Sequence, residues 1–165
     1  MLRETKKRVA VCGILVVILA VGLVAWLPAE AADPPPKPLK SGIVSFGDAA
    51  AHQADWGEMR SYFTGETAGT KDVLTAVAIV KLGKAVHRAH RHAEEEYLIL
   101  VEGSGTWSLD GKESPAKRGD ILYTEPWVYH GLTNTSSEQL IFVVVRFNSK
   151  GVKIPPRPDN RPDEQ

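Results

Sequence analysis

Two histidines and a glutamate lie close together in the middle of the chain, at His90, His92 and Glu96. In a β-strand alternate side chains share a face, so the two imidazoles would point the same way, and a short bend would bring the carboxylate alongside them. Such groups are costly inside an apolar core unless a partner satisfies them. A divalent cation binds neutral imidazole nitrogen and carboxylate oxygen at about 2.0–2.2 Å. The spacing predicts a metal site, and the alternative for the two histidines alone is a histidine-rich surface strand.

A second segment offers a third imidazole. His130 follows Gly119 by eleven residues and precedes Asn134 by four. His130, Leu132 and Asn134 share strand parity, so the imidazole would reach the site from a neighbouring strand. Asn134 is expected to fix the turn that follows rather than to bind metal.

These two segments resemble the paired motifs of the cupin superfamily. The first family motif, G-x5-H-x-H-x3,4-E-x6-G, is matched by His90, His92, Glu96 and Gly103, with Gly83 one residue early. The second, G-x5-P-x-G-x2-H-x3-N, is matched at Gly119, His130 and Asn134, with Pro126 one residue late and Val128 where its glycine is expected. The resemblance implies a single jelly-roll β-barrel. It also gives four residues the role of metal ligands: His90, His92, Glu96 and His130.

Three histidines and one glutamate fill four positions of an octahedron and leave two open for a ligand. Nitrogen donors favour a transition metal over magnesium or calcium. Manganese or zinc is expected first and iron next, and nickel and copper also suit the donor set. The predicted function is a metalloenzyme acting on a small oxygenated organic molecule, by dioxygenase, isomerase or decarboxylase chemistry. Two alternatives stay open: a non-catalytic barrel that binds a small ligand or metal, and a metal that only stabilises the fold.

Other polar residues near the first motif receive simpler interpretations. His87 is out of step with His90 and is expected at the rim of the barrel. His52 stands alone in an alanine-rich stretch and is expected to be exposed. Glu94 and Glu95 could act as acid or base near the metal, although solvated loop carboxylates are commoner.

Short apolar strands separated by turn signals surround the two motifs. The expected strands are Val73–Lys81, Glu96–Glu102, Thr106–Leu109, Ile121–Thr124 and Leu140–Phe147. The last is the longest apolar strand and should be central. Asp110-Gly111 predicts a two-residue hairpin turn, since type I′ requires positive φ at both positions. A helical turn is expected near 48–54. The fold class is therefore all-β, a sandwich or barrel by spacing alone.

The first 31 residues have the layout of a secretory signal. Four positive residues precede the uncharged run Val9–Leu27, and small residues follow it up to Ala31. A single-pass anchor helix is the alternative, because a run of this length can span a bilayer. In both cases the positive residues keep the N-terminus in the cytoplasm. We therefore expect a periplasmic or extracellular barrel, preceded by a signal or anchor helix and touching a membrane only through residues 9–27 if that helix is retained.

The rest of the chain divides by composition. Residues 32–41 are a proline-rich spacer, 42–149 the barrel, and 150–165 a proline-rich tail expected to be loose. Beyond residue 31 the chain has 16 basic and 18 acidic side chains and no cysteine, since the single Cys12 lies in the apolar run. This near-neutral body offers no broad basic face for nucleic acid. The expected partner is a small molecule, and the family resemblance adds a second copy of the chain in a homodimer.

Overall fold

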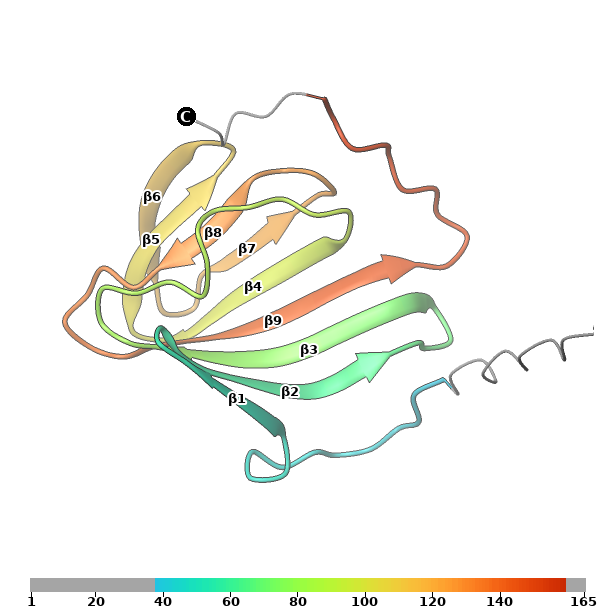
Figure 1. The fold of residues 1–165 in the computed structure, drawn as a ribbon, viewed down its shortest axis with the longest axis horizontal. Coiled ribbons are helices and arrows are strands. Elements are labelled where there is room, and N and C mark those ends of the chain that lie inside the picture. The colour runs from blue at the N-terminus through green and yellow to red at the C-terminus, as the bar shows by residue number, and fades with distance from the viewer. Residues whose placement is uncertain (1–37, 160–165) are drawn as a thin grey trace, which may run out of the picture. The chain divides into compact units, whose positions relative to one another are not determined.

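The apolar segment near the C-terminus forms a strand at the centre of the larger of two sheets. A computed structural model describes residues 38–159 of the chain. The larger sheet has six antiparallel strands in the order β1-β2-β3-β9-β4-β7 (Figure 1). Its strands are β1 (Ala50–Ala54), β2 (Gly57–Gly65), β3 (Thr70–Val80), β4 (Glu95–Glu102), β7 (Ile121–Thr124) and β9 (Leu140–Ser149). The expected central position of the last strand is confirmed.

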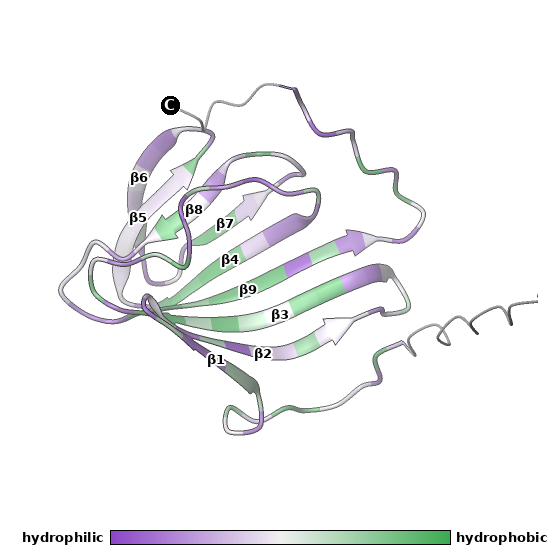
Figure 2. Cartoon of the chain, viewed as in Figure 1, coloured by the Kyte–Doolittle hydropathy of each residue, from purple (hydrophilic) through white to green (hydrophobic). Residues whose placement is uncertain are grey.

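A smaller sheet of three strands faces the larger one. Its order is β6-β5-β8, with β5 (Ser104–Leu109), β6 (Lys112–Lys117) and β8 (His130–Thr133). Alternate residues of β4 and β9 are buried, and they pack in one core cluster with Trp107 of β5 and Leu132 of β8. Figure 2 shows β9 hydrophobic over its first half and more hydrophilic toward its end. The two inner faces enclose the core of an all-β jelly roll, which confirms the expected fold class for this part of the chain.

The turns show where local sequence signals were sufficient and where they were not. Asp110 and Gly111 have φ of 49° and 72° between the paired residues Leu109 and Lys112, so the predicted two-residue hairpin turn is confirmed. The helical turn expected near 48–54 is wrong, because residues 50–54 form β1 and pair with β2. Alanine has the highest helix propensity, but propensity is worth less than about 1 kcal/mol per residue, and cross-strand pairing overrides it here.

The signal or anchor segment, residues 1–31, and most of the proline-rich spacer lie outside the described residues. Within 38–159 the structure contains no helix long and apolar enough to cross a membrane. The stretch 150–159 contains neither helix nor strand, and part of it contacts the barrel. The carbonyl of Pro155 accepts a hydrogen bond of 2.7 Å from the indole nitrogen of Trp127.

Candidate metal centre

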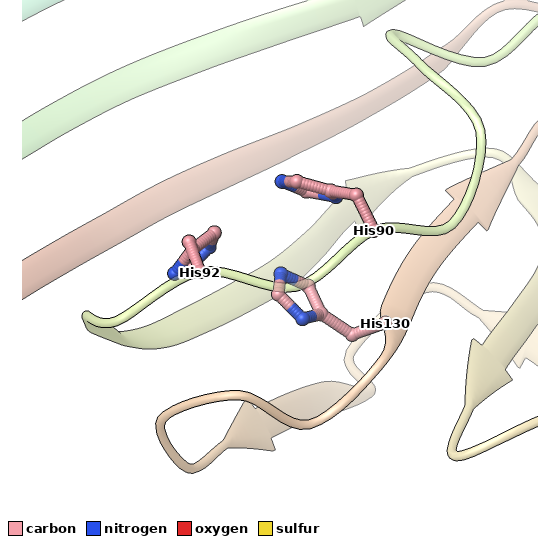
Figure 3. A group of neighbouring side chains, drawn as sticks. All are labelled: His90, His92 and His130. Atoms are coloured by element: carbon pink, nitrogen blue, oxygen red, sulfur yellow. The ribbon is translucent and has the colours of Figure 1, made fainter. Parts of the chain in front are cut away.

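A pair of backbone hydrogen bonds joins the two histidine-bearing segments. His90 lies in the loop before β4 and His130 begins β8, and each backbone nitrogen donates to the other residue's carbonyl, at 3.0 and 2.9 Å. Residues paired in this way project their side chains to the same face. The two ring centroids are 4.8 Å apart (Figure 3). The bridge therefore sets the two imidazoles side by side.

His92 enters the same cluster two residues after His90. Its carbonyl accepts a 2.7 Å hydrogen bond from the backbone nitrogen of Trp127, which holds the loop against the segment before β8. Its ring centroid is 4.8 Å from that of His130 and 5.2 Å from that of His90. One nitrogen from each of the three rings lies within 4.8 Å of the other two, close enough to share one ion (Figure 3).

Glu96 completes the group from β4. The side chain is on the inner face, and the residue is only 6% exposed. One carboxylate oxygen lies 3.2 Å from Nε2 of His130 and the other 3.4 Å from Nε2 of His92. The structure thus brings together all four residues that the sequence predicted as metal ligands.

The hydrogen bonds of two imidazoles fix which nitrogen faces the carboxylate. Nδ1 of His130 lies 2.9 Å from the carbonyl of Val128, and Nδ1 of His92 lies 3.1 Å from the carbonyl of Glu94. A carbonyl oxygen only accepts hydrogen bonds, so both Nδ1 atoms carry the proton. In a neutral ring each Nε2 therefore presents a lone pair to Glu96. Such contacts are repulsive unless the rings are protonated or a metal ion lies between them and the carboxylate.

Three buried nitrogens of the cluster have no hydrogen-bond partner among the described residues: Nδ1 of His90, Nε2 of His92 and Nε2 of His130. Buried polar atoms are almost always paired, so this gathering of unpaired nitrogens needs an explanation. Lone pairs facing a carboxylate are the donor set of a transition-metal ion, and the Nδ1 bonds to carbonyls are the second-shell contacts that orient such ligands. The residues present therefore fit a metal.

The electrostatics keep His90 and Glu96 in the forms that bind metal. Burial, aided by the neighbouring histidines His87, His130 and His92, lowers the pKa of His90 to about 4. Burial alone would raise the pKa of Glu96, but hydrogen bonds and positive charge from the rings of His130 and His92 in their protonated form outweigh it and lower that pKa to about 2. At neutral pH His90 is therefore uncharged and Glu96 is an anion.

The other polar residues considered from the sequence lie outside the group of four predicted ligands. His87 is exposed and its ring contacts that of His90, with centroids 3.8 Å apart. His52 is exposed on β1. Glu94 lies 3.3 Å from Nδ1 of His92, on the side away from the cluster's unpaired nitrogens, and Glu95 accepts a hydrogen bond from the hydroxyl of Tyr123.

Asn134 is fully buried and has the structural role expected from the sequence. Its amide nitrogen donates to the carbonyls of Val80 and Glu138, at 3.0 and 2.7 Å. Its amide oxygen accepts a bond from the backbone nitrogen of Ser136. These bonds fix the turn after β8 to the end of β3.

Sequence reasoning misplaced one turn residue and missed two residues near the site. The left-handed backbone before His130 occurs at Trp127, with φ of 68°, and not at Val128. The second family motif has two residues between its glycine and its histidine, so the glycine position that corresponds to His130 is 127. Gly131 was missed; a Cβ there would lie 3.1 Å from Cα of Ala89 and push against the loop that carries His90. Arg146 was also missed, although it has the inward parity of β9.

Comparison with known proteins agrees with this architecture. Residues 76–146 match the family model described as a cupin domain. Over 68 residues the chain is 35% identical to a gentisate 1,2-dioxygenase of Streptomyces sp. This match covers 40% of this chain and 19% of that protein. Over 57 residues it is 33% identical to an oxalate-binding protein of Thermotoga maritima, covering 34% of this chain and 47% of that protein. The chain thus spans less than half the length of either relative.

A solved structure supports the fold itself. The chain is similar to an RmlC-like cupin from Shewanella frigidimarina with a TM-score of 0.56, at 15% sequence identity. The match covers 68% of this chain and 95% of that structure. At this identity the similarity concerns the fold and not the activity.

Proposed function

The chain belongs to the cupin superfamily, and from that premise we propose that it is a metal-dependent enzyme. One divalent transition-metal ion is held by His90, His92, Glu96 and His130, and the substrate is a small oxygenated organic molecule. The observation that carries the proposal is the set of unpaired imidazole nitrogens that faces a buried carboxylate at 3.2 and 3.4 Å. A cation turns those repulsive contacts into attractive ones.

The donor set restricts the choice of metal ion but does not select a single element. Three imidazoles and one carboxylate suit manganese or zinc first and iron next, and nickel or copper remain compatible. A metal held there would supply Lewis acidity toward an oxygen atom of the substrate. The chain's own residues orient the ligands: the carbonyls of Val128 and Glu94 hold two imidazole rings. The bridge between His90 and His130 keeps the two segments in register.

A cavity beside the cluster supports binding of a small molecule. It is partly open to solvent, and His90 and Glu96 line it together with apolar side chains of both sheets. Mostly apolar walls with a few polar groups are typical of small-molecule sites. The names of the two relatives, a gentisate dioxygenase and an oxalate-binding protein, denote small oxygenated molecules. The second name also supports a non-catalytic binding barrel as the alternative function.

Metal content tests the ligand set directly. The full-length chain, purified without chelators, is expected to contain close to one transition-metal ion by elemental analysis. His92→Ala and His130→Ala should lose most of that metal while circular dichroism still reports the β-barrel. His52→Ala is the matched control, because it removes an exposed imidazole far from the cluster in sequence and should retain the metal. Equal metal content in His92→Ala and His52→Ala would overturn the ligand assignment.

A second measurement separates enzyme, binder and structural metal. If the protein is an enzyme, it should turn over a small oxygenated compound, and His92→Ala should lose this activity. Chelation should also abolish the activity of the wild type, and added metal should restore it. A binder takes up the same compound without changing it. A structural metal predicts instead that chelation unfolds the barrel, because binding free energy then contributes to folding.

We also propose that the barrel lies outside the cytoplasmic membrane. The support is the N-terminal sequence, in which positive residues precede the apolar run Val9–Leu27 and small residues follow it. Cell fractionation with N-terminal sequencing tests this. A mature N-terminus near residue 32 in an exported fraction indicates a cleaved signal, and an intact chain in the membrane fraction indicates an anchor. Full-length chain in the cytoplasm would contradict both.

A further inference from the structure

The cavity beside the candidate metal centre contains one cationic side chain that the metal site does not use. Arg146 lines this cavity together with His87, His90 and Glu96, and the remaining walls are largely apolar. Arg146 is on β9, where the inward-facing residues before it are Leu140, Phe142 and Val144. The row of inward aliphatic and aromatic residues thus ends in a guanidinium group.

The register of the sheet places this arginine next to the metal-binding residues. Arg146 pairs with Glu96 on β4, and on its other side with Leu74 on β3. Directly opposed residues have Cβ atoms about 4.5–5.5 Å apart and share a face. The guanidinium therefore belongs to the same layer of the barrel as the carboxylate that contacts His92 and His130.

Arg146 has no partner within the described part of the chain. Neither a hydrogen bond nor an ion pair joins its side chain to any residue between 38 and 159, because both oxygens of Glu96 face the histidines. The residue is partly buried. A partly buried guanidinium without a counter-ion is unfavourable, since it loses hydration without gaining charge-assisted hydrogen bonds. An anion in the cavity would supply those bonds.

The charges of the layer also favour an anion. With a divalent metal bound, the two positive charges of the ion are reduced by the one negative charge of Glu96, and the imidazoles are neutral. Arg146 adds a further positive charge, so the loaded cavity carries an excess of about two positive charges within a largely apolar wall. Such a cavity attracts an anionic ligand and disfavours a cationic one.

We propose that Arg146 anchors the ligand of this site, and that the ligand is a small carboxylate with a second oxygen atom directed toward the histidine cluster. The planar fork of arginine matches the two oxygens of a carboxylate. The second oxygen reaches the metal, and the short carbon body contacts the apolar wall around Leu74 and Phe142. A phosphate dianion fits less well, because no second cationic side chain lines the cavity beside Arg146. This inference rests on the proposed metal-dependent function and specifies its substrate class.

Pyruvate and its neutral amide, pyruvamide, form a matched pair of probes, because they differ in the carboxylate and share the neighbouring oxygen. Isothermal titration of the zinc-loaded full-length chain in a neutral detergent is expected to show pyruvate binding about tenfold or more tighter than pyruvamide. Arg146→Met should abolish this preference. Arg146→Lys keeps the charge but loses the fork, and should retain an intermediate preference. Arg118→Met, in an exposed turn, is the matched control and should behave as wild type.

Zinc content separates this inference from the proposed function. Arg146→Met should keep one zinc ion and bind it as tightly as wild type or more tightly, because a positive charge has been removed nearby. An unchanged preference for pyruvate in a zinc-loaded Arg146→Met, or phosphate binding more tightly than pyruvate to wild type, would overturn the role of Arg146 and leave the metal site standing. Wild type that takes up no zinc would overturn the metal site. The ratio of the affinities of the metal-free protein for pyruvate and pyruvamide would then still decide whether Arg146 selects the carboxylate.

Discussion

The stability of the metal-free protein should depend on pH through His90. The pKa of this residue is about 4 in the folded chain, because burial and the neighbouring histidines disfavour its charged form, against 6.5 when exposed. Between these values the unfolded chain binds a proton that the folded chain does not. Stability is therefore complete above pH 6.5 and falls as the pH drops from 6.5 toward 4.

The size of this effect follows from the two pKa values. At about 1.4 kcal/mol for each tenfold difference in proton affinity, the shift from 6.5 to about 4 corresponds to at most about 3 kcal/mol. His90 is only partly buried, and solvent screening reduces the expected loss to about 2 kcal/mol. Glu96 acts in a lower window, since its pKa is about 2 when folded and 4.5 when exposed. Its contribution is lost only below pH 4.5, so the two residues can be separated.

Urea unfolding of the protein in excess chelator, followed from pH 7.5 to 4.5, measures this linkage. Wild type should lose most of the 2 kcal/mol across that range, and His90→Gln should lose little of it. His52→Gln, which changes an exposed imidazole, is the control and should follow the wild-type curve. Parallel curves for wild type and His90→Gln would refute the reasoning, because His90 would then titrate alike in the folded and unfolded chains.

Three further substitutions test the scaffold, each by urea unfolding at pH 7.5. Asn134→Ala removes the hydrogen bonds that its amide donates to the carbonyls of Val80 and Glu138 and should cost about 2–3 kcal/mol; a loss under about 0.5 kcal/mol would contradict its anchoring role. Gly103→Ala should cost about 1–3 kcal/mol, since its φ is 83° and a Cβ would lie 2.5 Å from the carbonyl oxygen of Gln139; neutrality would contradict this. Leu100→Ala, at a 1% exposed position, should cost about 2–5 kcal/mol, and a smaller loss would mean that the core collapses around the gap.

Several features of the fold were readable from local sequence. Strand periodicity and turn residues predicted β4, β5, β7 and β9 closely, because alternation and positive φ are properties of neighbouring residues. Polar β6 was not predicted. Its sequence, Lys112–Lys117, has little apolar alternation, and the hairpin with β5 determines that it is a strand. The helical turn near 48–54 failed for the related reason that pairing with β2 outweighs local propensity.

The sequence by itself determined which side chains could bind a metal, because residue type, spacing and the resemblance to the two cupin motifs together point to His90, His92, Glu96 and His130. Only the tertiary structure decided how they meet. The bridge between His90 and His130 joins residues forty positions apart, and the Nδ1 bonds to Val128 and Glu94 set which nitrogens face Glu96. The same holds for Arg146, whose place beside Glu96 follows from strand register. The period-two pattern of a strand determines which side chains face the core, but only the tertiary fold determines which distant strand lies beside it and which residues are opposed.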